Sequence, residues 1–278
     1  MSEDDSEVKP SNDREIQKTF HRTVDEGTAR LDRPWSGLLA TGTVGGFDVG
    51  IGLLAALVVL DATGSRLLAA LAFTIGFIAL VLGKSELFTE NFLVPVVTTV
   101  ARRRPVRPLV RLWFGTGVSN LAAGWVLGWI IIGSLPHLEG VAIEAALLFA
   151  HLPVPIAFGL GILGGIVITL MTWLEHGSQT EGGRILSAAM AGFLFEAVPL
   201  NHFIITSLIM FWGIHAGGPL DYLDWLRIGG IALVSNIIGG IVLVTALRLM
   251  QIGGEEIHKE QARPRGARRE ADGVDEER

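Results

Sequence analysis

The sequence predicts an all-α membrane protein with six transmembrane helices, arranged as two inverted three-helix repeats in which the second and fifth helices are broken. Three observations predict this fold: an apolar composition, six long apolar stretches and an internal repeat. Of the 278 residues, 50% are hydrophobic and only 18% are charged, and the mean hydropathy is +0.49. A soluble domain of this size does not need so much apolar surface to fill its core.

The composition also excludes several classes of protein. The chain contains no cysteine, which rules out disulfides, thiolate metal sites and cysteine nucleophiles. Neither an HExxH nor a GxSxG pattern occurs, and four histidines in or near the connections have no metal-ligand spacing: His137, His151, His176 and His215. We therefore expect neither an enzyme nor a site for a metal or other cofactor.

Charge divides the chain into three regions. We expect a polar cytoplasmic N-terminal tail over 1–33, a six-span transmembrane domain over 34–250 and a charged cytoplasmic C-terminal tail over 251–278. Acidic residues concentrate near both ends, in MSEDDSEV and EADGVDEER, so we expect the tails to be solvated and disordered. The first 33 residues lack the pattern of a cleavable signal peptide, and we expect the first span to act as the insertion signal.

Six apolar stretches are long enough to cross a hydrocarbon core about 30 Å thick, which takes about 20 residues. They cover 36–60, 67–100, 109–132, 154–174, 185–214 and 225–250. An even number of spans places both termini on one side. Arginines crowd the second connection (Arg102, Arg103, Arg104, Arg107 and Arg111), whereas the first, third and fifth connections offer little beyond Arg66. The positive-inside bias therefore predicts a plasma or inner membrane protein with both termini in the cytoplasm.

Spans two and five are too long for simple crossings. A continuous helix of about 30 residues would reach about 45 Å. Both are also interrupted by polar residues: Lys84, Ser85, Glu86, Thr89, Glu90 and Asn91 in span two, and Glu196, Asn201, His202, Thr206 and Ser207 in span five. Such residues persist at membrane depth only where they face protein or water. We therefore expect two broken helices that line a cavity.

An internal repeat relates the two halves. VSNLAAGWVL at 118–127 resembles VSNIIGGIVL at 234–243, which places Asn236 116 residues after Asn120. The same offset carries Glu86 onto His202. Three spans in each half require inverted topology, and paired interrupted segments indicate a translocation site near the midplane. For Asn120 and Asn236 we favour a structural role, in which they tether broken-helix backbone through hydrogen bonds.

His202 is the most informative polar residue, because it is the ionisable group near the centre of span five whose charge can change near neutral pH. Burial disfavours its imidazolium form, whereas an arriving anion favours it. The alternative is a hydrogen-bonded structural histidine.

The other intramembrane polar residues have less specific interpretations. Lys84 and Glu86 either neutralise one another as an ion pair or face other partners. Thr89 and Asn91 supply a hydroxyl and an amide that could replace part of the hydration shell of a solute. Asp48 in span one has no obvious partner in the sequence.

Over about 36–250 the chain resembles the formate/nitrite transporter family. GKSELFTEN at 83–91 is similar to the second-helix loop of that family, in which a small residue and an acid precede Leu-Phe-Thr. LNHFIITSLIMFWGI at 200–214 is similar to its fifth-helix motif with a central histidine, and SNIIGG at 235–240 is similar to its sixth-helix pattern.

Two departures indicate a divergent branch of that family: Lys84 stands where a small residue is usual, and Asn201 where an acid often precedes the histidine. The resemblance implies a homopentamer of aquaporin-like protomers, each with its own pore for formate, nitrite or related monovalent anions, with proton involvement. It also implies that His202 and Thr89 form the central polar pair and that Phe77 and Phe195 lie near hydrophobic constrictions. We assign the substrate pathway to His202, Thr89, Asn201, Lys84, Glu86 and Asn91, and the constrictions to Phe77, Leu87, Phe88 and Phe195.

The function expected from these observations is transmembrane transport of a small monovalent anion, with His202 assisting by protonation or electrostatics. The expected partners are the anion, possible protons, membrane lipids and further copies of the chain, but not nucleic acid. The alternative is an aquaporin-like channel for small neutral solutes, which fits the broken helices but lacks paired Asn-Pro-Ala motifs. A non-transporting scaffold or sensor would have to work through short acidic tails that resemble no folded domain.

Overall fold

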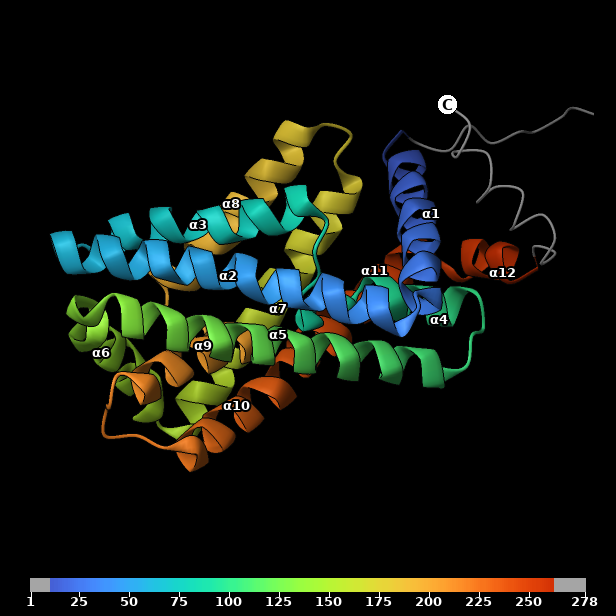
Figure 1. The fold of residues 1–278 in the computed structure, drawn as a ribbon. Helices are drawn as coiled ribbons and strands as arrows, with labels where there is room; N and C mark the ends of the chain where they lie inside the picture. Colours follow the sequence, from blue (N-terminus) through green and yellow to red (C-terminus); the bar gives the residue numbers. More distant parts are fainter. Residues whose placement is uncertain (1–10, 263–278) are drawn as a thin grey trace, which may run out of the picture.

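The computed structural model describes residues 11–262, and the regular elements within them are all helices. In the first half of the chain, α2 (Trp35–Thr63) packs against both α3 (Arg66–Gly83) and α5 (Val106–Ser134). In the second half, α7 (Val154–Gly177) packs against α8 (Glu181–Ala197) and α10 (Tyr222–Ile237). The all-α fold predicted from the apolar pattern is confirmed (Figure 1).

Both overlong spans are broken, as predicted. Span two consists of α3, the 3₁₀-helix η1 (Phe88–Phe92) and α4 (Val94–Ala101), and span five consists of α8 and α9 (Phe203–His215). Lys84 ends α3 in the left-handed region, with φ of 51°. Among the described helices, five are long and apolar enough to cross a membrane individually, and the segments Phe88–Ala101 and Phe203–His215 are shorter apolar helices. The broken crossings are therefore assembled from pieces.

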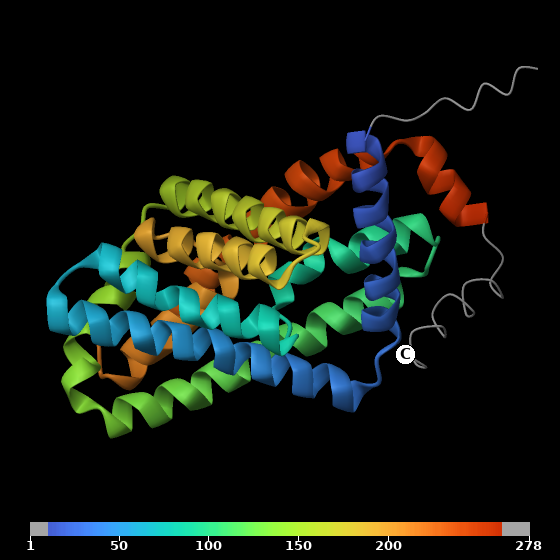
Figure 2. The ribbon, with the colours of Figure 1, turned by 90° about the horizontal axis from the view of Figure 1, so that it is seen from above.

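The N-terminal segment corrects the expectation of a disordered tail, because it forms helix α1 (Ser11–Asp32). Its apolar residues recur at helical spacing, and Phe20, Val24 and Leu31 are almost fully buried. Phe20 and Val24 share a cluster with Leu93 and Val97 of the second-span segment. Helix α1 lies across the end of the bundle at which α2 and α5 begin, as Figures 1 and 2 both show.

The last described helix, α12 (Gly254–Ala262), lies at the same end of the bundle as α1. Arg102 donates to Glu260 at 3.1 Å, and His21 contacts Glu256 at 3.2 Å. The first and last described helices therefore share one end, which the even number of spans requires. Residues 1–10 and 263–278 lie outside the described residues, and so does the disorder expected for them.

Two features were not predicted from the sequence. Helix α6 (Glu139–Ala150), preceded by the short η2 (Pro136–Leu138), lies in the third connection and packs against α9. The last span continues from α10 through a π-helical stretch, η3 (Ile238–Thr245), into α11 (Ala246–Ile252). The apolar pattern could not distinguish helix α6 from an ordinary connection, or the π-helical stretch η3 from an ordinary α-helix.

The two halves are inverted with respect to one another. The last turn of α7 reaches α1, because His176 contacts Glu26 at 2.9 Å, whereas α2 begins at that same end. Close packing at glycines also repeats. A Cβ on Gly46 of α2 would lie 2.6 Å from the carbonyl oxygen of Asn120, and one on Gly165 of α7 would meet that of Asn236. These small residues let the helix backbones approach closely.

The glycine contact on α7 leads to a paired test. Gly165→Ala should lower the free energy of unfolding by about 1–3 kcal/mol, because the new methyl group meets backbone that cannot move aside. Gly159→Ala on the same helix faces open space and should be nearly neutral. Thermal unfolding of both variants in one detergent measures the difference, and equal midpoints would contradict the close approach.

Candidate functional site

Two buried asparagines hold the broken helices by matching hydrogen bonds. Asn120 of α5 accepts the backbone N–H of Phe88 through Oδ1 at 2.8 Å. Its Nδ2 donates to the carbonyl oxygens of Gly42 at 2.6 Å and Glu86 at 3.0 Å. These bonds link α5 to α2 and to the first break, whose backbone groups have lost helical partners.

Asn236 of α10 makes the same three bonds in the second half. Its Oδ1 accepts the N–H of Phe203 at 2.9 Å, and its Nδ2 donates to the carbonyl oxygens of Gly161 at 2.8 Å and Asn201 at 2.9 Å. Asn236 thus links α10, α7 and the second break in the same way that Asn120 links α5, α2 and the first break.

The matching bonds correct one equivalence drawn from the repeat. Asn201, not His202, occupies the place of Glu86, because each offers its carbonyl oxygen to the tethering asparagine. The offset is 116 residues between the asparagines but one residue less within the breaks, so His202 matches Leu87. The stretch from the break to the tethering asparagine spans 34 residues from Glu86 to Asn120 but 35 from Asn201 to Asn236, so a single constant offset cannot align both.

His202 and Thr89 meet between the two breaks. His202 Nε2 and Thr89 Oγ1 lie 2.7 Å apart, and neither residue is exposed. The other ring nitrogen, Nδ1, accepts the N–H of Ile205 at 3.3 Å and so caps the start of α9. A neutral ring with Nδ1 as acceptor carries its proton on Nε2. The Nε2–H group then donates a hydrogen bond to the Thr89 hydroxyl oxygen. Thr89 then keeps its own hydroxyl hydrogen for another acceptor.

Two phenylalanines adjoin this polar pair. The rings of Phe77 and Phe195 are stacked with centroids 5.5 Å apart, and the Phe195 ring lies edge-on to His202 at 4.8 Å. Phe77 lies about one turn from Leu80 and Val81, which line a polar cavity. The aromatic pair therefore adjoins His202, and its Phe77 precedes the cavity-lining residues on α3.

Phe88, also assigned to a constriction, has a different setting. Its ring packs edge-on against Phe203 at 5.7 Å and Trp113 at 6.3 Å. The preceding Leu87 is fully buried. Phe88 thus contributes to aromatic packing between the starts of η1 and α9 and the helix α5.

The polar cavity has a volume of about 380 Å³ and lies beneath α1, at the end of the bundle where α1 and α12 meet. Charged side chains from four helices and the first break line most of it. The lining residues are Glu26, Arg30, Arg33, Leu80, Val81, Lys84, Ser85, Glu86, Glu90, Glu175, His176 and Arg184.

Glu86 is paired with arginines of the N-terminal segment, so the possible ion pair between Lys84 and Glu86 is wrong. Arg33 donates to Glu86 at 2.5 Å, and Arg30 Nε lies 3.4 Å from the same oxygen. Lys84 ends α3 with an exposed side chain. Arg30 and Arg33 were missed as site residues because basic residues before a first span also act as topology signals.

Arg30 holds together several polar groups from distant parts of the chain. It also donates to Glu26 at 2.9 Å and to Asn91 Oδ1 at 3.3 Å. Although burial opposes ionisation of Glu26, Arg30 and the hydrogen bond with His176 hold the pKa of its carboxyl below its usual range.

Three other predicted polar residues contact protein groups. Asn91 donates to the carbonyl oxygen of Leu87 at 3.4 Å, and Asn201 donates to that of Ala157 at 3.1 Å. The Oδ1 atom of Asn201 is buried, and the described residues offer it no hydrogen-bond partner. Asp48 accepts a hydrogen bond from Ser85 at 2.5 Å, a contact that only the fold reveals. Within 11–262, no group of three or more histidine or acidic side chains could hold a metal ion.

Comparison with known proteins gives consistent matches. The family model described as formate/nitrite transporter matches residues 17–250. The chain is 26% identical over 236 residues to the uncharacterized transporter YrhG of Bacillus subtilis, covering 80% of this chain and 87% of that protein. It is 24% identical over 264 residues to the inner membrane protein YfdC of Escherichia coli, covering 90% and 83%.

Solved structures share the fold at low sequence identity. An FNT family ion channel superposes with a TM-score of 0.74 at 15% identity, covering 84% of this chain and 96% of that one. A pentameric formate channel with formate bound superposes with a TM-score of 0.63 at 19% identity, covering 77% and 95%.

The buried ion pairs lead to a test of coupling between α1 and the first break. Arg30→Gln and Glu86→Gln should each lower the free energy of unfolding by about 3 kcal/mol, since each leaves a buried partner charge. The double variant should cost about 1–3 kcal/mol less than the sum of the two. Lys84→Gln is the matched control and should change stability by less than about 0.5 kcal/mol. Additive losses, measured by denaturant unfolding, would show that the two residues do not interact.

Proposed function

The chain belongs to the formate/nitrite transporter family, and on that premise we propose that it passes small monovalent anions such as formate or nitrite through a pore in each protomer. It is a multi-pass membrane protein of a family of channels and transporters, not an enzyme. The buried contact between His202 and Thr89, with the stacked Phe77 and Phe195 beside it, is the observation that carries the proposal.

The proposed path leads through the charged cavity, the contact between His202 and Thr89, and the phenylalanine pair. The side chains of these residues are almost fully buried, so an anion that passes them loses hydration worth many kcal/mol. Thr89 can donate its hydroxyl hydrogen to the anion while it accepts from His202. The N-terminus of α9 at His202 adds the positive end of a helix dipole. These groups offset part of the desolvation cost without a fixed positive charge.

We propose that His202 is neutral until an anion arrives. Protonation would make Nδ1 a donor and end its acceptance from the Ile205 N–H. The positive charge is therefore favoured only when an anion balances both this loss and the cost of burial. Proton involvement would follow from this coupling between anion and ring charge.

The test is flux against pH in proteoliposomes, with formate, nitrite, acetate, hydrosulfide, chloride, glycerol and water as solutes. His202→Asn should lower anion flux at least about tenfold and flatten its pH dependence, because asparagine can still cap α9 but cannot titrate. Thr89→Val should lower flux about tenfold, the effect of one lost hydrogen bond of roughly 1.4 kcal/mol, while the pH profile keeps its shape.

His137→Asn is the matched control, because this exposed histidine lies in the third connection. Gel filtration checks that each variant still assembles. If His202→Asn retains both the flux and the pH profile of the wild type, His202 is structural and the proposed site is wrong. Movement of only glycerol or water would favour the aquaporin-like alternative.

We also propose that the chain forms a homopentamer with one pore per protomer, as the name of one structural relative describes for that protein. The apolar side chains exposed along α3, α5 and α8 supply surface for subunit contacts, among them Leu71, Trp129 and Leu186. Native mass spectrometry in mild detergent should give the mass of five chains. A strictly monomeric particle that still transports would contradict this assembly.

The end of the bundle that carries α1 and α12 is proposed to face the cytoplasm. The basic connection with Arg102, Arg103 and Arg104 lies at this end, and positive residues favour the cytoplasmic side. A reporter fused in this connection should give a cytoplasmic signal, and one fused at Arg66 an external signal. The reverse pattern would overturn the orientation.

A further inference from the structure

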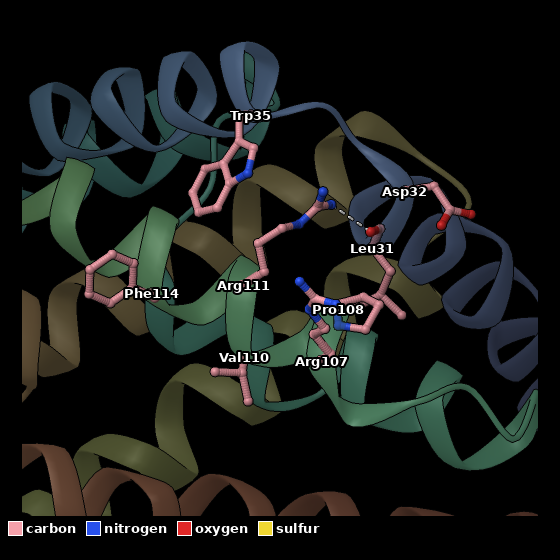
Figure 3. A pocket seen from close by; sticks show the side chains of 8 residues that line it. All are labelled: Leu31, Asp32, Trp35, Arg107, Pro108, Val110, Arg111 and Phe114. Carbon is pink, nitrogen blue, oxygen red and sulfur yellow. Dashed lines mark hydrogen bonds between the residues drawn. The ribbon is translucent and has the colours of Figure 1, made fainter.

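A second cavity, separate from the charged one, lies on the outer surface between the starts of α2 and α5. We call it the interfacial groove. Its volume is about 900 Å³, and its lining residues are Leu31, Asp32, Trp35, Arg107, Pro108, Val110, Arg111 and Phe114 (Figure 3). We propose that the interfacial groove binds one anionic phospholipid per protomer, with the phosphate at its arginines and an acyl chain along α5.

The arginines of the interfacial groove supply the charge for a phosphate. Arg107 is exposed and makes no hydrogen bond or ion pair within the described chain. Arg111 donates through Nη2 to the carbonyl oxygens of Leu31 and Arg33, both at 2.8 Å, which holds its guanidinium in place. Its Nε is buried and finds no hydrogen-bond partner among residues 11–262. Arginine is well suited to phosphate recognition because its donors form a planar fork.

The acidic residue of the interfacial groove does not cancel this charge. Asp32 forms a bidentate pair with Arg104, with Nη1 at 2.9 Å from Oδ2 and Nη2 on the other oxygen. The pair is neutral as a unit, so Arg107 and Arg111 leave the interfacial groove with an excess of two positive charges. A neutral apolar partner would not need these charges, whereas an anionic headgroup is complementary to them.

Apolar side chains continue from the arginines along one face of α5. Residues 107, 110, 111 and 114 follow the spacing that aligns side chains on a helix. Phe114 is 67% exposed and Val110 is 54% exposed, although both belong to a membrane-spanning helix. Trp35 lies across the interfacial groove, with its ring centre 5.8 Å from the Arg111 guanidinium. An aromatic ring and basic residues at the first turns of two spans are typical of headgroup depth, and the exposed apolar face beyond them suits an acyl chain.

Native mass spectrometry of the intact oligomer tests this proposal. The wild type is titrated with phosphatidylglycerol and with phosphatidylcholine of the same acyl chains. We expect one phosphatidylglycerol per protomer and weaker binding of phosphatidylcholine. Arg107→Gln should weaken phosphatidylglycerol binding about fivefold, the factor for roughly 1 kcal/mol per arginine near an anionic surface, and leave phosphatidylcholine unchanged. Arg103→Gln is the matched control, because this exposed arginine in the same connection lies outside the interfacial groove.

Further arms of the experiment separate other occupants. Phe114→Ala should also weaken phosphatidylglycerol binding, whereas soluble glycerol phosphate should not compete with the lipid at equal concentration. Equal lipid binding by the Arg107 and Arg103 variants, or equal affinity of the wild type for both lipids, would overturn the proposal. Loss of the oligomer in the Arg107 variant, with no change in lipid selectivity, would show that the interfacial groove is a contact between subunits.

Discussion

The structure depends on one constraint: backbone N–H and C=O groups released by a broken helix have no water to bind within a membrane. Asn120 and Asn236 meet it with three hydrogen bonds each, one accepted from the segment that follows the break and two donated to carbonyl oxygens. The bonds are possible only because glycines at 46 and 165 bring α2 and α7 against these asparagines. Close helix packing and broken helices are therefore parts of one arrangement.

The same backbone scheme carries different chemistry in the two halves. At matching places the first break has Glu86 and Leu87, whereas the second has Asn201 and His202. The buried charge of Glu86 requires compensation, which Arg30 and Arg33 supply from the N-terminal segment. The uncharged second break needs no such partner. The inverted repeat thus supplies a symmetric support for an asymmetric site.

Helix α1 of the N-terminal segment is therefore part of the candidate site, because it supplies side chains to the charged cavity. Phe20 and Val24 pack in an apolar cluster that attaches α1 to one end of the bundle. The Arg30 guanidinium contacts Glu86, Glu26 and Asn91. The charged cavity consequently combines a segment before the first span with the break in the second. The polar pair of His202 and Thr89 is fully buried beside the Phe77 and Phe195 rings, so charged side chains concentrate in the cavity and neutral donors lie next to the phenylalanine pair.

The sequence by itself determined the class of fold, the positions of six spans and the two breaks, because hydropathy and intramembrane polar residues reflect the demands of the bilayer directly. It also indicated the family and the two asparagines of the repeat. Only the tertiary structure decided that Glu86 meets Arg33 and that Ser85 meets Asp48. The pairing of His202 with Thr89, which the family resemblance had implied, is a contact across 113 residues. The tertiary structure also showed that residues 11–32 form a docked helix and that the repeat shifts by one residue at the breaks. Hydropathy constrains each segment against lipid, but partners inside the bundle depend on how helices far apart in the chain turn toward one another.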